Sequence, residues 1–242
     1  MAKLLLIFID ATKFLATMKT FIFLSCMSSI LLLGKLVDNN SVEGKINFSA
    51  TDELLFQRGT NYQDSTPSEE KLRIDALNHP FKNIYISLHP LDFTPDLTET
   101  KDANITQRAQ TFFPNIIAIT KGSTVKFINE DELYHNVYSL TPKARFNIGR
   151  RPMGNVYGQK INKVGVIKLG CDIHDDMSAT ILSLDTPYFT KIKEDGTYKI
   201  TGLPDGKYEI KVYHPAMDRF NDEIEVSGGS TLKKDITLQS KA

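Results

Sequence analysis

Cysteine is scarce in this sequence, which has only Cys26 and Cys171 among 242 residues. Cys26 lies in the apolar N-terminal segment, so removal of that segment would leave a single cysteine. One cysteine cannot form an intramolecular disulfide. A single cysteine in an exported chain indicates a bond to a partner, a reactive thiol or a metal ligand.

The sequence also has no net charge, because its 29 basic residues are balanced by 29 acidic ones. Residues 1–36 hold four lysines and one aspartate, so the rest of the chain has 25 basic and 28 acidic residues. Nucleic-acid binding normally needs a clear basic surface. A mildly acidic chain without a basic stripe is therefore not expected to bind nucleic acid.

Residues 1–36 are predicted to be a secretory signal peptide, with Met18 as the possible true start. Lys19 precedes an apolar run over residues 20–34, which is typical of such signals. The run is shorter than the about 20 residues of a membrane-spanning helix. The alternative is a retained N-terminal anchor, since no small-residue cleavage site follows. We expect export to the periplasm or cell envelope of a bacterium, with no membrane span in the mature chain.

Beyond residue 36, short alternating runs of β-branched and aromatic residues recur between turn sequences, which favours an all-β fold. Two units are predicted, over residues 37–185 and 186–242. A helical or loop insertion is expected near 57–80, because Thr66 begins a capping-box pattern. Asp-Gly pairs in the last unit indicate tight hairpins.

The most informative motif is "CDIHDDM", which places Cys171, His174 and Met177 at three-residue intervals. It joins the predicted strands 164–170 and 178–184, so the three side chains are expected on one short loop. A thiolate, an imidazole and a thioether are donors that copper selects, and two histidines, one cysteine and a weak methionine form a blue-copper site. His135 offers the second imidazole. Individually, each residue could instead serve only in packing or at a strand end.

The segments "TFFPNIIAITKGSTVKFINEDELYHNVYSL" and "GVIKLGCDIHDDMSATILSL" resemble cupredoxins of the plastocyanin/amicyanin type. The likeness is greatest to bacterial proteins labelled methylamine utilization proteins. It implies a cupredoxin-like Greek-key β-sandwich, followed by a small sandwich similar to transthyretin or carboxypeptidase-regulatory units. It implies one type 1 copper bound by His135, Cys171, His174 and Met177. Asn136 would join the ligand loops by hydrogen bonds.

The motif departs from the family at Asp172, Asp175 and Asp176, where family members more often have asparagine or proline. The added carboxylates are expected to favour oxidised copper and to affect partner docking. The resemblance implies an exported carrier of single electrons, and the acidic loop would suit a basic, cytochrome-like redox partner. The alternative function is copper storage or delivery, or a binding module without redox chemistry.

Enzyme motifs are absent from the sequence, which has no Gly-x-Ser-x-Gly elbow, P-loop, His-Glu-x-x-His or dinucleotide fingerprint. A Cys171–histidine nucleophile pair would leave Met177 without a role. The remaining histidines lack the motif of further copper sites and are expected to be structural or exposed: His79, His89 and His214. The sequence therefore predicts a protein that is not an enzyme.

Overall fold

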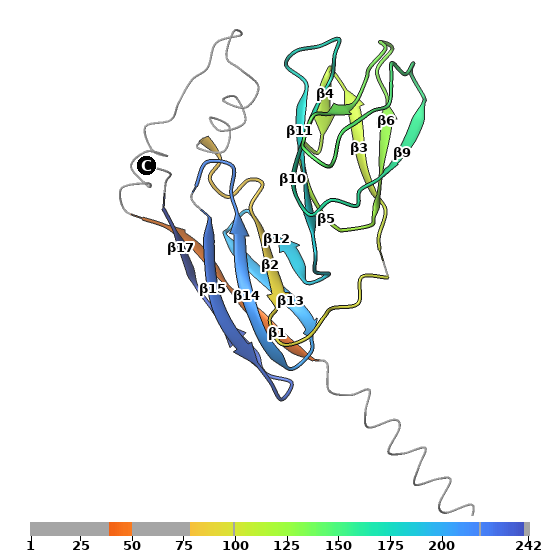
Figure 1. Cartoon of the computed structure of the whole chain (residues 1–242). Coiled ribbons are helices and arrows are strands. Elements are labelled where there is room, and N and C mark those ends of the chain that lie inside the picture. Colours follow the sequence, from red (N-terminus) through yellow and green to blue (C-terminus); the bar gives the residue numbers. More distant parts are fainter. Residues whose placement is uncertain (1–38, 50–77, 99, 218, 240–242) are drawn as a thin grey trace, which may run out of the picture.

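The computed structural model describes residues 39–49, 78–98, 100–217 and 219–239. These residues form strands β1 to β17 (Figure 1), which confirms the prediction of an all-β chain. The predicted signal peptide and most of the predicted insertion lie outside the described residues. Within the described part, no helix is long and apolar enough to cross a membrane.

Strands β3 to β11 form one sandwich, here called the central unit (Figure 1). One sheet has the order β5-β11-β10-β7-β8, with bounds Ile116–Thr120, Ser178–Leu184, Gly165–Gly170, Tyr138–Ser139 and Phe146–Asn147. The other has the order β4-β3-β6-β9, with bounds Thr111–Phe113, Ala103–Arg108, Thr124–Asn129 and Val156–Lys160.

The core of the central unit lies between these two sheets. Val125 and Phe127 alternate with the exposed Lys126 along β6, so one face of this strand points inward. Ile167 and Ile181 reach the same cluster from β10 and β11. Burying each such side chain contributes about 1.5–3 kcal/mol. This apolar cluster provides a rigid base for the loops at the sandwich end.

The remaining strands form a second sandwich, here called the flanking unit. One sheet has the order β13-β1-β16, with β17 also paired to β1, and its bounds are Thr197–Leu203, Asn40–Phe48, Thr231–Lys233 and Ile236–Leu238. The other has the order β12-β2-β14-β15, with bounds Phe189–Lys191, Tyr85–Pro90, Gly206–Tyr213 and Phe220–Val226.

The flanking unit takes strands from both ends of the chain, which differs from the expected boundaries. The sequence pattern predicts one unit over residues 37–185, but β1 pairs with β13 and β2 pairs with β14. Val42 and Ile86 accordingly belong to the flanking core. Alternation in a sequence indicates a strand and its buried face, but it does not name the strand's partner. The division of the chain into independently folding domains stays a prediction.

Several contacts join the two units. The Tyr85 hydroxyl on β2 donates to the Ile116 carbonyl at 3.0 Å, and the Asn83 side chain donates to Asn115 Oδ1 at 3.2 Å. Burial raises the pKa of Tyr85 to about 12, so its hydroxyl keeps the donating proton. These contacts hold one sheet of the flanking unit against the edge of the central unit.

Candidate metal centre

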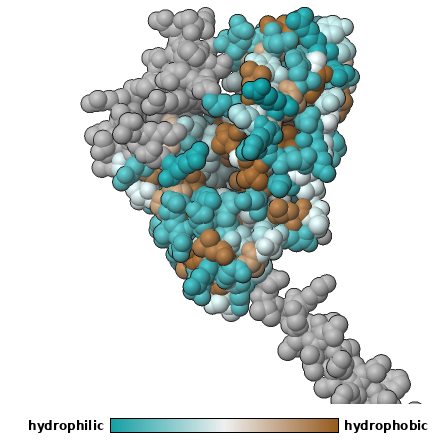
Figure 2. All heavy atoms as spheres, viewed as in Figure 1, coloured by the Kyte–Doolittle hydropathy of each residue, from teal (hydrophilic) through white to brown (hydrophobic). Residues whose placement is uncertain are grey.

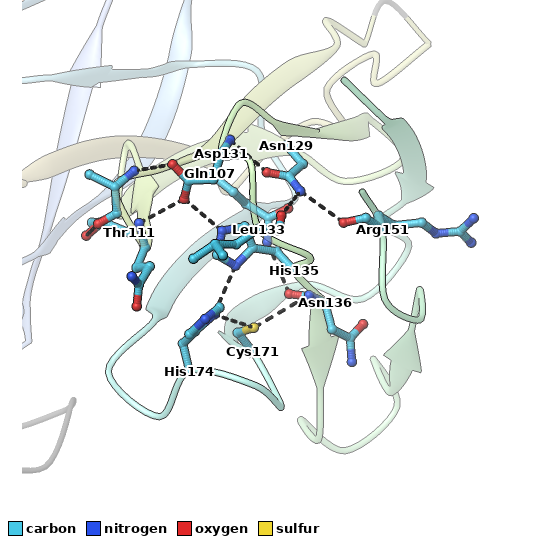
Figure 3. A network of polar contacts seen from close by, with 12 residues as sticks. Gln107, Thr111, Asn129, Asp131, Leu133, His135, Asn136, Arg151, Cys171 and His174 are labelled. Atoms are coloured by element: carbon cyan, nitrogen blue, oxygen red, sulfur yellow. Dashed lines mark hydrogen bonds and ion pairs between the residues drawn. The ribbon is translucent and has the colours of Figure 1, made fainter. Parts of the chain in front are cut away.

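His135 follows β6 at the end of the central unit and is fully buried. Its backbone forms a two-way bridge with Arg151, with hydrogen bonds of 3.0 and 2.7 Å. The side chain of Asn129 donates to the carbonyls of Leu133 and Arg151 at 2.8 and 2.9 Å (Figure 3). The loop that carries His135 is therefore held by its backbone bridge to Arg151 and by the side chain of Asn129.

Cys171, His174 and Met177 lie on the loop between β10 and β11, as predicted. Because Gly170 pairs with Ser178, the loop begins and ends at adjacent positions of one hairpin. Cys171 and Met177 are 4% and 2% exposed and belong to the central core, whereas His174 is partly exposed. The Met177 N–H donates to the His174 carbonyl at 3.1 Å, which closes the loop on itself.

Three of the four predicted donor residues come together at this point. Nδ1 of His135 lies 3.1 Å from Nδ1 of His174, which lies 3.8 Å from Sγ of Cys171. The three donor atoms all lie within 4.8 Å of one another. Figure 3 shows both rings and the sulfur directed at one another. Bonds of about 2.0–2.3 Å from nitrogen and sulfur to a metal ion fit this spacing.

Asp131 determines which nitrogen of His135 faces the other donors. Its Oδ2 lies 2.7 Å from Nε2 of His135. An ionised carboxylate only accepts hydrogen bonds, so Nε2 carries a proton, and the lone pair that binds a metal ion is the one on Nδ1. The lone pair therefore points toward His174 and Cys171, as a metal ligand requires.

The carboxylate of Asp131 is itself held by the backbone. The N–H groups of Ala109 and Gln110 donate to its two oxygens at 2.6 and 2.9 Å, and both residues have left-handed backbone conformations with φ of 49° and 53°. Burial by itself would raise the pKa of Asp131. The hydrogen bonds from Gln110, His135 and Ala109 outweigh burial and hold this pKa below its usual value. Asp131 is thus charged and fixed in position.

Asn136 joins the two ligand loops through its backbone. Its N–H donates to Sγ of Cys171 at 3.5 Å, and its carbonyl accepts from Nε2 of Gln107 at 3.1 Å. Its buried Oδ1 has no hydrogen-bond partner among the described residues. A donor to sulfur stabilises the thiolate and orients it. The predicted linking role of Asn136 is therefore served by its main chain in this structure.

The rim of the site is both acidic and apolar. Asp172, Asp175 and Asp176 are exposed, and Asp172 lies 3.8 Å from Nε of Arg150. The exposed hydrophobic residues Leu133 and Tyr134 directly precede His135, and the exposed Ile173 directly precedes His174. The partly exposed His174 is the metal-site side chain nearest to solvent in this rim. Exposed charges at such distances interact weakly because water and salt screen them.

Sequence reasoning missed Asp131. It lies in the polar run "NEDE", whose pattern indicates only a turn between two strands. Its position four residues before His135 was the available signal of a contact between the two side chains. The loop conformation that allows this contact is set by hydrogen bonds of Asn129 to Asp131 and Leu133. The contact to Ala109 and Gln110 joins residues more than twenty positions apart, so it was not predictable from local sequence.

No protein-family model and no curated protein matches this chain. Among solved structures, it is similar to a purple cupredoxin from Nitrosopumilus maritimus, at 23% identity over 34% of this chain and all of that one, with a TM-score of 0.32. A copper-containing nitrite reductase from Thermus scotoductus matches at 22% identity over 40% of this chain and 25% of its own, with a TM-score of 0.33. A single-residue variant of amicyanin in its reduced Cu(I) form matches at 15% identity over 41% of this chain and 98% of its own, with a TM-score of 0.33.

Proposed function

We propose that this protein binds one copper ion at His135, Cys171 and His174, with Met177 as a weak axial ligand, and carries single electrons between redox partners. The observation that supports the proposal is the convergence of two imidazole nitrogens and one sulfur within 4.8 Å. Two histidines and a cysteine with a nearby methionine form the donor set of blue-copper centres. Harder metals such as magnesium and calcium prefer oxygen ligands, which this cluster does not supply.

Each residue has a distinct task in this proposal. Copper, when bound, supplies a one-electron couple between Cu(I) and Cu(II). Cys171 offers the thiolate, and the N–H of Asn136 stabilises it. His135 is held by Asp131 and by its backbone bridge, so its ring cannot swing when the charge of the site changes. His174 is the partly exposed donor and is the proposed edge for electron exit.

The buried donors are suited to rapid electron exchange. Cys171 and Met177 are packed in the central core, and His135 has no exposed surface. Close packing keeps side chains in one arrangement, so little rearrangement accompanies a change of redox state. Export to the periplasm and docking of a basic redox partner at the acidic rim also belong to this proposal.

The test of copper binding is the visible absorption of purified protein after addition of one equivalent of Cu(II). We expect an intense thiolate-to-copper charge-transfer band that disappears on reduction. Cys171→Ser should abolish the band while circular dichroism still reports a folded β protein. Cys26→Ser in the full-length chain is the matched control and should keep the band. A band that survives Cys171→Ser would show that another thiol binds the metal.

Electrochemistry separates electron transfer from the alternative of copper storage or delivery. A carrier should show a reversible one-electron potential and keep its copper through repeated cycles. A delivery protein should lose copper to a competing copper-binding peptide and should not cycle reversibly. The second outcome would overturn the electron-transfer part of the proposal while leaving copper binding intact.

A further inference from the structure

A cavity of about 430 Å³ lies between the two units, away from the metal centre. One wall comes from β2, β14 and β15 of the flanking unit, and the other from β10 and β11 of the central unit. Figure 2 shows hydrophobic side chains gathered where the two units meet. Cavities of this size hold small organic molecules.

Three polar side chains that line this cavity form a continuous relay from one wall to the other. Alternation along β2 places Ser87 and His89 on the same face. Oγ of Ser87 lies 2.9 Å from Nε2 of His89, and Nδ1 of His89 lies 2.7 Å from Oδ1 of Asp185. Asp185 comes from the end of β11 in the central unit, so packing of the two units completes the relay.

The direction of each hydrogen bond follows from the chemistry of the groups. The Asp185 carboxylate can only accept, so Nδ1 of His89 carries the proton. Nε2 of the neutral ring then holds a lone pair, and the Ser87 hydroxyl must donate to it. Burial is the main factor that lowers the pKa of His89, with Lys211 acting in the same direction and Asp185 opposing it. The ring is therefore neutral near pH 7 and can accept a proton.

The cross-strand register places a positive charge beside the serine. Lys211 on β14 lies directly opposite Ser87, and Glu209 lies opposite His89. Nζ of Lys211 pairs with Glu209 at 2.8 Å. Because β2 pairs with β12 on one side and β14 on the other, its backbone N–H groups are used in the sheet. Lys211 and Arg219, which also lines the cavity, are thus the positively charged side chains available to stabilise the negative oxygen that forms on a substrate carbonyl.

Apart from Ser183 and Asp185, the opposite wall of the cavity is apolar. Val166 on β10 and Leu182 and Leu184 on β11 line it. An apolar wall facing a nucleophile, a base and a cation suits a small uncharged molecule with one polar, reactive bond. A carboxylic ester with an aromatic or short aliphatic group has this character. An activated ester, whose alcohol is a good leaving group, suits this site best. Such an ester needs less stabilisation of its oxyanion, and here only side chains are available to provide it.

We propose that this cavity is an esterase site in which Ser87 is the nucleophile, His89 the general base and Asp185 the residue that orients His89. Ser87 Oγ attacks the ester carbonyl carbon while its proton passes to Nε2 of His89. The carbon–oxygen bond to the alcohol breaks, and the alcohol leaves with that proton. Water then attacks the acyl–Ser87 bond, releases the carboxylic acid and restores the serine. This arrangement has the roles of a Ser-His-Asp triad.

The proposal departs from the expectation that this protein is not an enzyme. No Gly-x-Ser-x-Gly motif surrounds Ser87. The serine lies within strand β2 and not at the sharp turn that such a motif forms. The imidazole of His89 and the carboxylate of Asp185 come from separate units of the structure. The site is independent of the metal centre, so it stands or fails separately from the proposed copper function.

The test is labelling of the full-length folded protein with a fluorophosphonate, followed by peptide mass spectrometry. We expect the label on Ser87, with loss of labelling in Ser87→Ala and in the heat-unfolded protein. Ser183→Ala is the matched control, because Ser183 lines the same cavity and its buried hydroxyl has no hydrogen-bond partner among the described residues. That variant should label as wild type does.

Hydrolysis of p-nitrophenyl acetate provides the second measurement. We expect Ser87→Ala to abolish the serine-dependent rate and Asp185→Asn to lower it about 100-fold, the range in which a positioned base acts. Asp185 is exposed, so its substitution should preserve the fold, which melting temperature checks. Absence of label on Ser87 in the native protein, or equal rates in wild type and Asp185→Asn, would overturn the proposal.

Discussion

The carboxylate of Asp131 lies 2.7 Å from Nε2 of His135 and also accepts hydrogen bonds from the N–H groups of Ala109 and Gln110. A residue of one ligand loop is thereby tied to the turn between β3 and β4. The contact fixes both the tautomer and the direction of the buried imidazole. It is the point at which the sandwich frame is coupled to the proposed metal site.

Removal of this contact should weaken copper binding. Asp131→Ala frees the ring of His135 and leaves two backbone N–H groups without their acceptor. Loss of such an outer partner of a histidine ligand typically costs about 10–100-fold in metal affinity. Competition with a chelator of known affinity measures the change. Glu132→Ala is the matched control, since Glu132 is an exposed neighbouring carboxylate and should leave affinity unchanged. Equal affinities in the two variants would contradict the role of Asp131.

The axial position is tested by Met177→Gln. A harder oxygen donor favours Cu(II), so the reduction potential should fall while copper stays bound. Met177 is 2% exposed, so burying the amide should also destabilise the fold by about 1–3 kcal/mol. Protein-film voltammetry measures the potential. If potential and spectrum both stay as in wild type, Met177 serves only in packing, and the exposed Met153 becomes the next residue to test.

The acidic loop should govern the salt dependence of electron transfer. Asp175 and Asp176 are exposed beside His174, and charge of one sign steers an oppositely charged partner at a rate that falls with ionic strength. We expect reduction of the Cu(II) protein by a basic cytochrome to slow as salt rises. Asp175→Asn with Asp176→Asn should flatten this dependence and raise the potential slightly. Stopped-flow rates with equal salt slopes for both proteins would place docking elsewhere.

The inter-unit cavity should make stability depend on pH. Burial is the main factor that lowers the folded-state pKa of His89, with Lys211 adding to it and Asp185 and Glu209 opposing it. As the pH falls, His89 therefore becomes protonated near pH 6.5 in the unfolded chain but only at a lower pH in the folded protein. This contribution to stability is present above about pH 6.5 and is lost as the pH falls toward the folded value.

His89→Gln removes the titrating group and should reduce the loss of stability between about pH 7 and pH 5. Urea unfolding followed by circular dichroism at several pH values measures the free energy of unfolding. Wild type and variant are compared by slope, because the variant also loses a hydrogen bond at every pH. Parallel slopes would show that His89 has the same pKa in both states.

Local sequence was enough to predict the all-β class and the placement of the donor-bearing loop. Alternating residues indicate which side chains of a strand are buried, and the spacing of Cys171, His174 and Met177 follows from one short loop between two paired strands. His135 was identified because its chemistry completes a known donor set. These predictions depend on residues that are neighbours in sequence or on the identity of a side chain.

Tertiary structure decided the features that depend on pairing between distant segments. The partners of β1 and β2 lie more than one hundred residues away, so only the folded chain shows that they belong with the C-terminal strands. Asp131 reaches the turn at Ala109, and Asp185 reaches His89, in the same manner. The physical reason is that a sequence pattern specifies what a strand buries, whereas hydrogen-bond geometry across sheets and loops specifies which groups meet.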